Sequence, residues 1–200
     1  ELNQRWIDDY PALKITTGKA PMFPFVLAGD AIDRKLYDHV NAYTGELGSD
    51  GVVRTAAANL NAGHVVLQQP PTQPGEALPT AKKRLRTLEV LSATRSMPTA
   101  FKIVPDKSHS GDVMGIMQSV RNDDQPNATV DAILRCLQVT DAASYATLRQ
   151  TFDTENTAHQ AVANRLETVH VPVLPDREYI HDPCTMAIFR LFDAQGLRVP

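Results

Sequence analysis

The sequence has no excess of positive charge and only two cysteines. Its 20 Lys and Arg residues are set against 23 Asp and Glu residues, which gives a net charge of −3. This balance offers no general electrostatic reason to bind nucleic acid, and we expect no nucleic-acid partner. Cys136 and Cys184 are too few and too far apart to indicate a disulfide scaffold or a four-ligand zinc site. Whether they pair is not decided by the sequence, so a bacterial cytoplasmic and a secreted location both stay open.

Long apolar runs are also missing. No stretch approaches the ~18 apolar residues of a membrane-spanning helix, so we expect no transmembrane segment. No basic and then apolar segment of the signal-peptide type stands at the start. The chain begins at Glu1 without a Met, and Leu2 and Trp6 have the spacing of one helical face. We therefore expect the sequence to begin inside an element, as a piece of a longer protein.

A further absence concerns catalysis. No Gly-x-Ser-x-Gly segment occurs in the 200 residues. That pattern holds a nucleophilic serine on a strand-to-helix turn, so this chain does not supply such a serine in the usual way. Ser108 and Ser110 are turn residues in our interpretation, because neither stands between a strand and a helix.

The apolar runs that are present predict an α/β fold. Residues 23–29 and 100–105 are short and almost continuously apolar, as in parallel strands covered on both faces. Residues 30–43 follow the first run with apolar positions three and four apart, which predicts a helix. Residues 64–67 predict a strand, 85–91 predict another, and the Pro-rich residues 69–80 predict a surface insertion.

The second half is predicted to be helical and then β-rich. Apolar spacing predicts helices over 113–120 and 129–139. Asp141 is predicted to cap a further helix that runs to about Leu166, with an interruption near Asp153 and Thr154. Strands are expected over 169–174 and 185–192, followed by a turn at 193–196. We accordingly divide the chain into a partial α/β domain, residues 1–166, and a β-rich segment, residues 167–200.

Two loops combine an acid with a base. Asp50 lies in the turn Gly48-Ser49-Asp50-Gly51, and His109 follows the second buried run within Ser108-His109-Ser110-Gly111. A histidine that takes a proton from a serine needs a carboxylate behind its other ring nitrogen. Taken singly, each residue is also explained as an ordinary turn residue. Asp30 and Asp33 follow the first buried run and are reserve candidates for the acid, or carboxylates favoured at the start of a helix.

These two loops resemble a known family. Ser49-Asp50-Gly51-Val52-Val53 with the following Ala-rich stretch resembles the acid loop of bacterial lipases and esterases of the α/β-hydrolase superfamily. Val104-Pro105 through Ser108-His109-Ser110-Gly111 is similar to their histidine loop, and residues 30–51 resemble a phospholipase-like bacterial branch. The resemblance covers residues 23–120 well. It implies the C-terminal part of an α/β-hydrolase fold, without the nucleophile turn.

The resemblance implies a function as well. A parent protein would hydrolyse carboxylic esters, most of all lipid esters, with His109 as base and Asp50 as the acid that orients it. The serine would lie on an upstream segment of the same protein, so the chain alone is expected to be inactive. No cofactor is implied, although some members hold calcium near these loops, and Asp106 or Asp112 could contribute. The alternative is a non-catalytic interaction domain whose open strand edges pair with a partner.

Overall fold

The computed structural model describes residues 23–32, 48–71, 74–75, 77, 80, 83, 87–123, 125–162, 165–169, 176–181, 185–193 and 195–199. These residues fall into two compact units. One unit comprises those between 25 and 58 and from 100 onward, and the other comprises Phe23, Pro24 and those between 59 and 99. The helix predicted over 30–43 lies almost wholly outside the described residues, as does the predicted N-terminal helical segment.

The first unit is built on two parallel strands, β1 (Phe25–Gly29) and β4 (Ala100–Val104). Phe25 pairs with Ala100 and Gly29 pairs with Val104, so the two strands end side by side. β4 is buried along almost its whole length, and Phe101 and Ile103 form a core cluster with Ala28. The two apolar runs therefore do form adjacent parallel strands, as their composition predicts.

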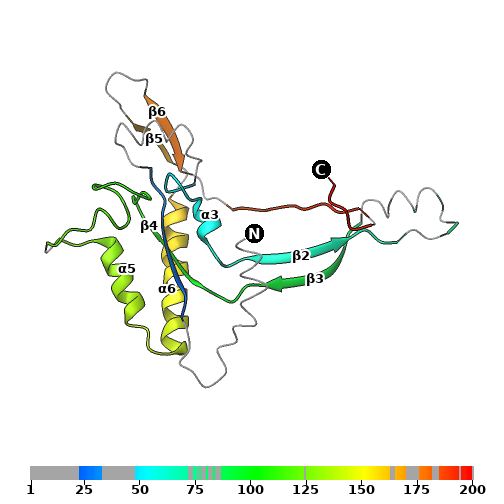
Figure 1. Ribbon diagram of the computed structural model, residues 1–200, viewed down its shortest axis with the longest axis horizontal. Helices are drawn as coiled ribbons and strands as arrows, with labels where there is room; N and C mark the ends of the chain where they lie inside the picture. The colour runs from blue at the N-terminus through cyan, green and yellow to red at the C-terminus, as the bar shows by residue number, and fades with distance from the viewer. Residues whose placement is uncertain are drawn as a thin grey trace. The chain divides into compact units, whose positions relative to one another are not determined.

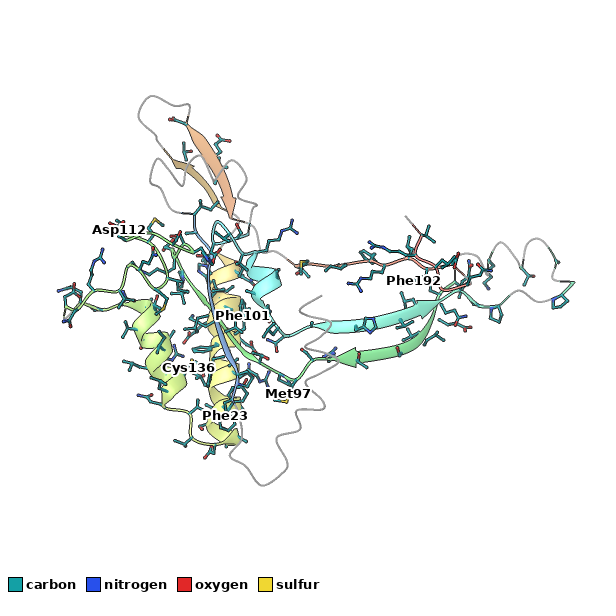
Figure 2. The ribbon with its side chains drawn as sticks, viewed as in Figure 1. Phe23, Met97, Phe101, Asp112, Cys136 and Phe192 are labelled. Carbon is teal, nitrogen blue, oxygen red and sulfur yellow. The ribbon has the colours of Figure 1, made fainter. Side chains whose placement is uncertain are left out.

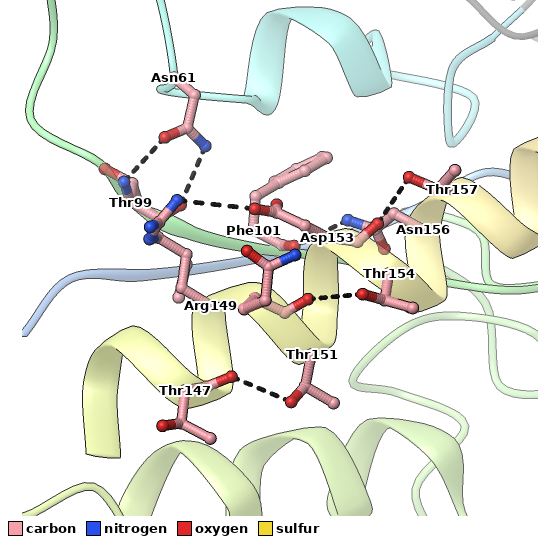
Figure 3. A network of polar contacts seen from close by, with 12 residues as sticks. Asn61, Thr99, Phe101, Thr147, Arg149, Thr151, Asp153, Thr154, Asn156 and Thr157 are labelled. Carbon is pink, nitrogen blue, oxygen red and sulfur yellow. Dashed lines mark hydrogen bonds and ion pairs between the residues drawn. The ribbon is translucent and has the colours of Figure 1, made fainter. Parts of the chain in front are cut away.

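A helix satisfies the backbone of β4. The helix α6 (Ala142–Ala161) lies beside β4 (Figure 1). The Asn156 side chain accepts a hydrogen bond from Ile103 N at 2.9 Å and donates one to Phe101 O at 2.8 Å (Figure 3). The Tyr145 hydroxyl accepts from Ala100 N at 3.0 Å. These side chains give buried backbone groups the partners that another strand would otherwise provide.

Side-chain caps begin both long helices. Asn127 accepts hydrogen bonds from the backbone of Thr129 and Val130 at the start of α5 (Ala128–Leu137). Asp141 caps α6 in a reciprocal capping box with Ser144, so the predicted cap is confirmed. The predicted interruption near Asp153 is wrong, because α6 is continuous. Its threonines remain compatible with a helix because their hydroxyls bond carbonyls four residues earlier (Figure 3); these are Thr147, Thr151, Thr154 and Thr157.

An ion-pair network connects α5, α6 and β4. Glu155 on α6 bonds Arg135 of α5 and Lys102 of β4, each at 2.8 Å. Arg135 also lies 4.8 Å above the centre of the Phe152 ring, which is fully buried. Burial acts to raise the pKa of Glu155, but its hydrogen bonds and charge interactions with Arg135 and Lys102 outweigh burial and lower that pKa. The carboxylate is therefore stabilised in its ionised form.

The second unit contains an antiparallel hairpin of β2 (Gly63–Gln68) and β3 (Glu89–Arg95). The strand predicted over 64–67 is confirmed, whereas the strand predicted over 85–91 begins only at Glu89. Asn61 closes the base of the hairpin by accepting from Thr99 N at 2.8 Å and donating to Thr99 O at 2.9 Å.

The residues that follow α6 are only partly regular. Strands β5 (Arg165–Val169) and β6 (Arg177–His181) form a second antiparallel hairpin. β5 begins before the predicted 169–174, most of which lies outside the described residues. Residues 185–192 form no strand, and Phe192 is mostly exposed (Figure 2). The turn after Asp193 is confirmed, with Gly196 at φ 79°.

Replacing Asn156 tests how β4 is held. Asn156→Ala leaves a buried N–H and a buried carbonyl of β4 without these partners, and we expect a loss of about 2–4 kcal/mol in the free energy of unfolding. The measurement is urea unfolding. Thr157→Ala is the matched control, because the Thr157 hydroxyl is exposed and bonds only its own helix in the contacts described here. Equal midpoints for the two variants would contradict this role of Asn156.

Acid should weaken the network around Glu155. Its pKa is lowered from an ordinary 4.5, so its pairs stabilise the fold above that pH, and the contribution disappears as the pH falls through the lower folded-state value. Glu155→Gln should therefore unfold at lower urea than the wild type at neutral pH, and the difference should shrink as the pH falls below 4.5. A difference that does not change with pH would count against this assignment.

Candidate active site

The Asp50 turn is built by its own backbone and carboxylate. Asp50 N donates to Val53 O at 3.1 Å, and Gly51 occupies φ +98°, a conformation that glycine adopts without strain. The oxygen Oδ1 of Asp50 accepts from Val52 N at 3.1 Å and from Val53 N at 2.7 Å. Only 7% of the Asp50 side chain is exposed. The turn thus fixes the carboxylate and leaves its second oxygen for another partner.

The loop after β4 holds His109. Ser108 is buried, and its N–H donates to Met114 O at 3.0 Å while its carbonyl accepts from Ile116 N at 2.8 Å. Gly115 lies so close to the carbonyl of Gly111 that a Cβ there would overlap it. Residues 112–119 consequently form a series of turns. The helix predicted over 113–120 is wrong, because these backbone bonds fold the segment back onto Ser108.

The two loops meet at Asp50 and His109. Nδ1 of His109 lies 3.1 Å from Oδ2 of Asp50, and His109 N donates to the Asp50 carbonyl at 2.8 Å. An ionised carboxylate has no proton to donate, so Nδ1 carries the proton in this hydrogen bond and Nε2 is the acceptor nitrogen of the neutral ring. The His109 side chain is 48% exposed. A buried acid therefore orients a histidine that is open to solvent.

The two carboxylate oxygens of Asp50 have different partners. Oδ1 performs the turn chemistry and Oδ2 faces the imidazole. The turn is what prevents the carboxylate from rotating away from His109, because two backbone N–H groups bind the other oxygen.

Asp30, the one reserve acid among the described residues, bonds partners other than His109. Asp30 follows β1, but its Oδ2 lies 2.5 Å from Nε2 of His159. Asp33 lies outside the described residues. Asp106 donates its backbone N–H to Oδ1 of Asp30, and the Asp112 carbonyl bonds Arg121. No sequence pattern pointed to His159, since 129 positions separate it from Asp30.

Two further properties concern the described residues alone. Within them, no group of three or more His, Cys, Asp and Glu side chains gathers closely enough to hold a metal ion. None of their helices combines the length and the apolar composition that crossing a membrane requires.

Gly29 sets how closely β1 approaches the histidine loop. A Cβ at Gly29 would overlap the carbonyl oxygen of Lys107, two residues before His109. Gly29→Ala should therefore lower the free energy of unfolding by about 1–3 kcal/mol. Gly63→Ala is the control, since its nearest described neighbour would be Thr94 O at 4.0 Å. Urea unfolding measures both, and equal stability of the two variants would refute the close approach.

The likeness of this chain to known proteins is found among solved structures. No protein-family model matches the chain, and no curated protein sequence matches it. Solved structures do match it, and two of them are described here. Phospholipase PlaB from Legionella pneumophila is 36% identical over 98% of this chain and 37% of that chain, with a TM-score of 0.71. The same phospholipase in complex with thio-NAD is 37% identical over 99% of this chain and 39% of that chain, with a TM-score of 0.72. The chain spans less than two-fifths of these structures, and over that span it has a mixed α/β, phospholipase-like fold.

Proposed function

We propose that these residues form the acid-and-histidine part of an α/β-hydrolase that cleaves carboxylic esters. The observation that carries the proposal is the hydrogen bond between Asp50 and His109, which joins a buried carboxylate to an exposed imidazole. In a serine hydrolase the acid holds the tautomer of the base, and the base exchanges protons with nucleophile and leaving group. The likeness to a phospholipase supports the same arrangement.

The proposed reaction uses Nε2 of His109, the ring nitrogen that carries no proton when Nδ1 bonds Asp50. Nε2 of His109 accepts the serine hydroxyl proton as the serine oxygen bonds the ester carbonyl carbon. The imidazolium, stabilised by Asp50, then returns the proton to the leaving alcohol as the C–O bond breaks. Water repeats the sequence on the acyl-enzyme and releases the carboxylic acid. In this proposal the serine and the oxyanion donors belong to a segment of the parent protein outside these 200 residues, which contain no Gly-x-Ser-x-Gly.

The proposed substrate is a lipid ester. The support is the phospholipase likeness, together with exposed apolar residues that are close in sequence to both members of the pair. Val52 is 69% exposed and is two positions from Asp50, while Val113 is 66% exposed in the loop that follows His109. Exposed apolar side chains in the two loops that carry the reacting pair suit an acyl chain better than a charged substrate.

A second candidate is a non-catalytic interaction domain. One observation favours it: large apolar side chains between 188 and 192 are exposed by 59–85%, and they are Ile188, Phe189, Leu191 and Phe192. On this proposal the Asp50–His109 bond is only structural. Ester hydrolysis and its dependence on His109 separate the two candidates.

The hydrolase proposal is tested on the polypeptide that carries these residues together with the serine-bearing segment. His109→Ala and Asp50→Asn should each lower kcat for a phospholipid or a p-nitrophenyl ester by about 10³- to 10⁴-fold. His64→Ala on β2 is the control and should keep wild-type activity. A fluorophosphonate that labels activated serines should react with the wild type and far more slowly with both variants. Equal labelling of all four proteins would reject the triad.

A further inference from the structure

A second carboxylate–imidazole pair contacts the backbone of the histidine loop. Asp30 directly follows the last residue of β1, and His159 lies in the last turn of α6. Nε2 of His159 and Oδ2 of Asp30 are 2.5 Å apart, with 24% and 19% of their side chains exposed. The pair is therefore mostly buried, and it connects a strand end with a helix end that are 129 positions apart in the sequence.

The second oxygen of Asp30 holds the backbone of the loop. Oδ1 of Asp30 accepts from Asp106 N at 2.9 Å, and Ala31 N donates to Lys107 O at 3.0 Å. Asp106 has φ +57°, a left-handed conformation that is uncommon for residues with a side chain, although Asp adopts it more readily than most. A hydrogen bond to the backbone of such a residue helps to hold it in this conformation. Asp30 supplies one such hydrogen bond at Asp106.

The backbone conformation at Asp106 determines the position of the His109 backbone. Asp106 is three residues before His109, and the intervening Lys107 is bonded to Ala31. The His109 backbone must arrive within reach of the Asp50 carbonyl, to which its N–H donates at 2.8 Å. A different backbone conformation at Asp106 would redirect the chain at this point and change the approach of the imidazole to Oδ2 of Asp50.

We propose that Asp30 and His159 are positioning residues, which fix the left-handed turn at Asp106 and thereby hold His109 against Asp50. His159 orients the Asp30 carboxylate through Oδ2 so that Oδ1 faces the backbone of Asp106. The two Asp–His pairs thus have different roles. Asp50–His109 presents a reactive imidazole, and Asp30–His159 fixes the backbone that leads to that imidazole. The inference rests on the proposed function only in giving His109 a reactive role.

The arrangement also accounts for why Asp30 is a poor candidate for the catalytic acid here. Both of its oxygens have partners, Asp106 N and His159, and neither partner is His109. Asp50 likewise uses one oxygen for backbone N–H groups, but its other oxygen faces His109. Each acid therefore binds backbone N–H through one oxygen and a histidine through the other. The two acids differ in which histidine they bind.

The test reads the state of the His109 ring directly. In a protein labelled with nitrogen-15, long-range proton–nitrogen spectra distinguish an imidazole held with its proton on Nδ1 from an unconstrained ring. His159→Phe keeps a ring of similar size and removes the nitrogen that bonds Asp30, and Asp30→Ala removes both bonds. We expect the His109 signals of both variants to move toward those of an unconstrained ring. We also expect amide exchange at Asp106 to become at least about tenfold faster.

Two controls separate this effect from general destabilisation. Asp153→Asn removes a carboxylate from α6 that pairs with Arg149 at 3.6 Å, and His64→Gln removes a histidine from β2. Both should leave the His109 signals and Asp106 exchange unchanged. Wild-type signals for His109 in folded His159→Phe would overturn the proposal. Should Asp30→Ala fail to fold, an Asp106 amide that exchanges freely in the wild type would overturn it equally.

The result is independent of hydrolysis. Altered His109 signals would support the positioning role, and if the polypeptide that also carries the serine-bearing segment cleaved no ester, the proposed function would be rejected separately. Unaltered signals in an active esterase would reject the positioning role and keep the proposed function. Where the protein is an esterase, both variants should lower kcat by more than they change KM, because the base and not the substrate contact is displaced.

Discussion

The parallel pairing of β1 with β4 is the interaction on which the described site depends. Because both strands run in the same direction and in register, their carboxyl ends meet, and the chain leaves both strands at one edge. The loop after β4 carries His109, while the end of β1 carries Gly29 and Asp30, which contact that loop. A shift of this register would separate the histidine loop from its backbone partners.

Two strands alone make a weak sheet, and side chains of α6 compensate for this. Asn156 and Tyr145 bond backbone groups of β4, and the Glu155 network joins α6 to both β4 and α5. The same helix carries His159 in its last turn. One helix therefore stabilises the strand and also holds the acid that contacts the turn before His109.

Sequence reasoning was most successful where the signal was local. Apolar runs identified both parallel strands, and the Asp141 cap followed from its position before a periodic segment. It was least successful where backbone contacts override periodicity. Residues 113–120 have helical spacing, but Ser108 and Gly111 bond their backbone into turns. The spacing of residues along the sequence does not show which side chains pair in the folded protein, so nothing in the sequence identified His159 as a partner of Asp30.

The sequence by itself determined the acid and the base as candidates, because a Gly-flanked Asp turn and a histidine after a buried run are local patterns. It also left Asp30 as a rival acid. Only the tertiary structure decided which of the two carboxylates bonds His109, since that depends on which carboxylate oxygen faces which imidazole across the packed strands. Hydrogen bonds between residues 59 and 129 positions apart are set by packing, and packing is a property of the folded chain.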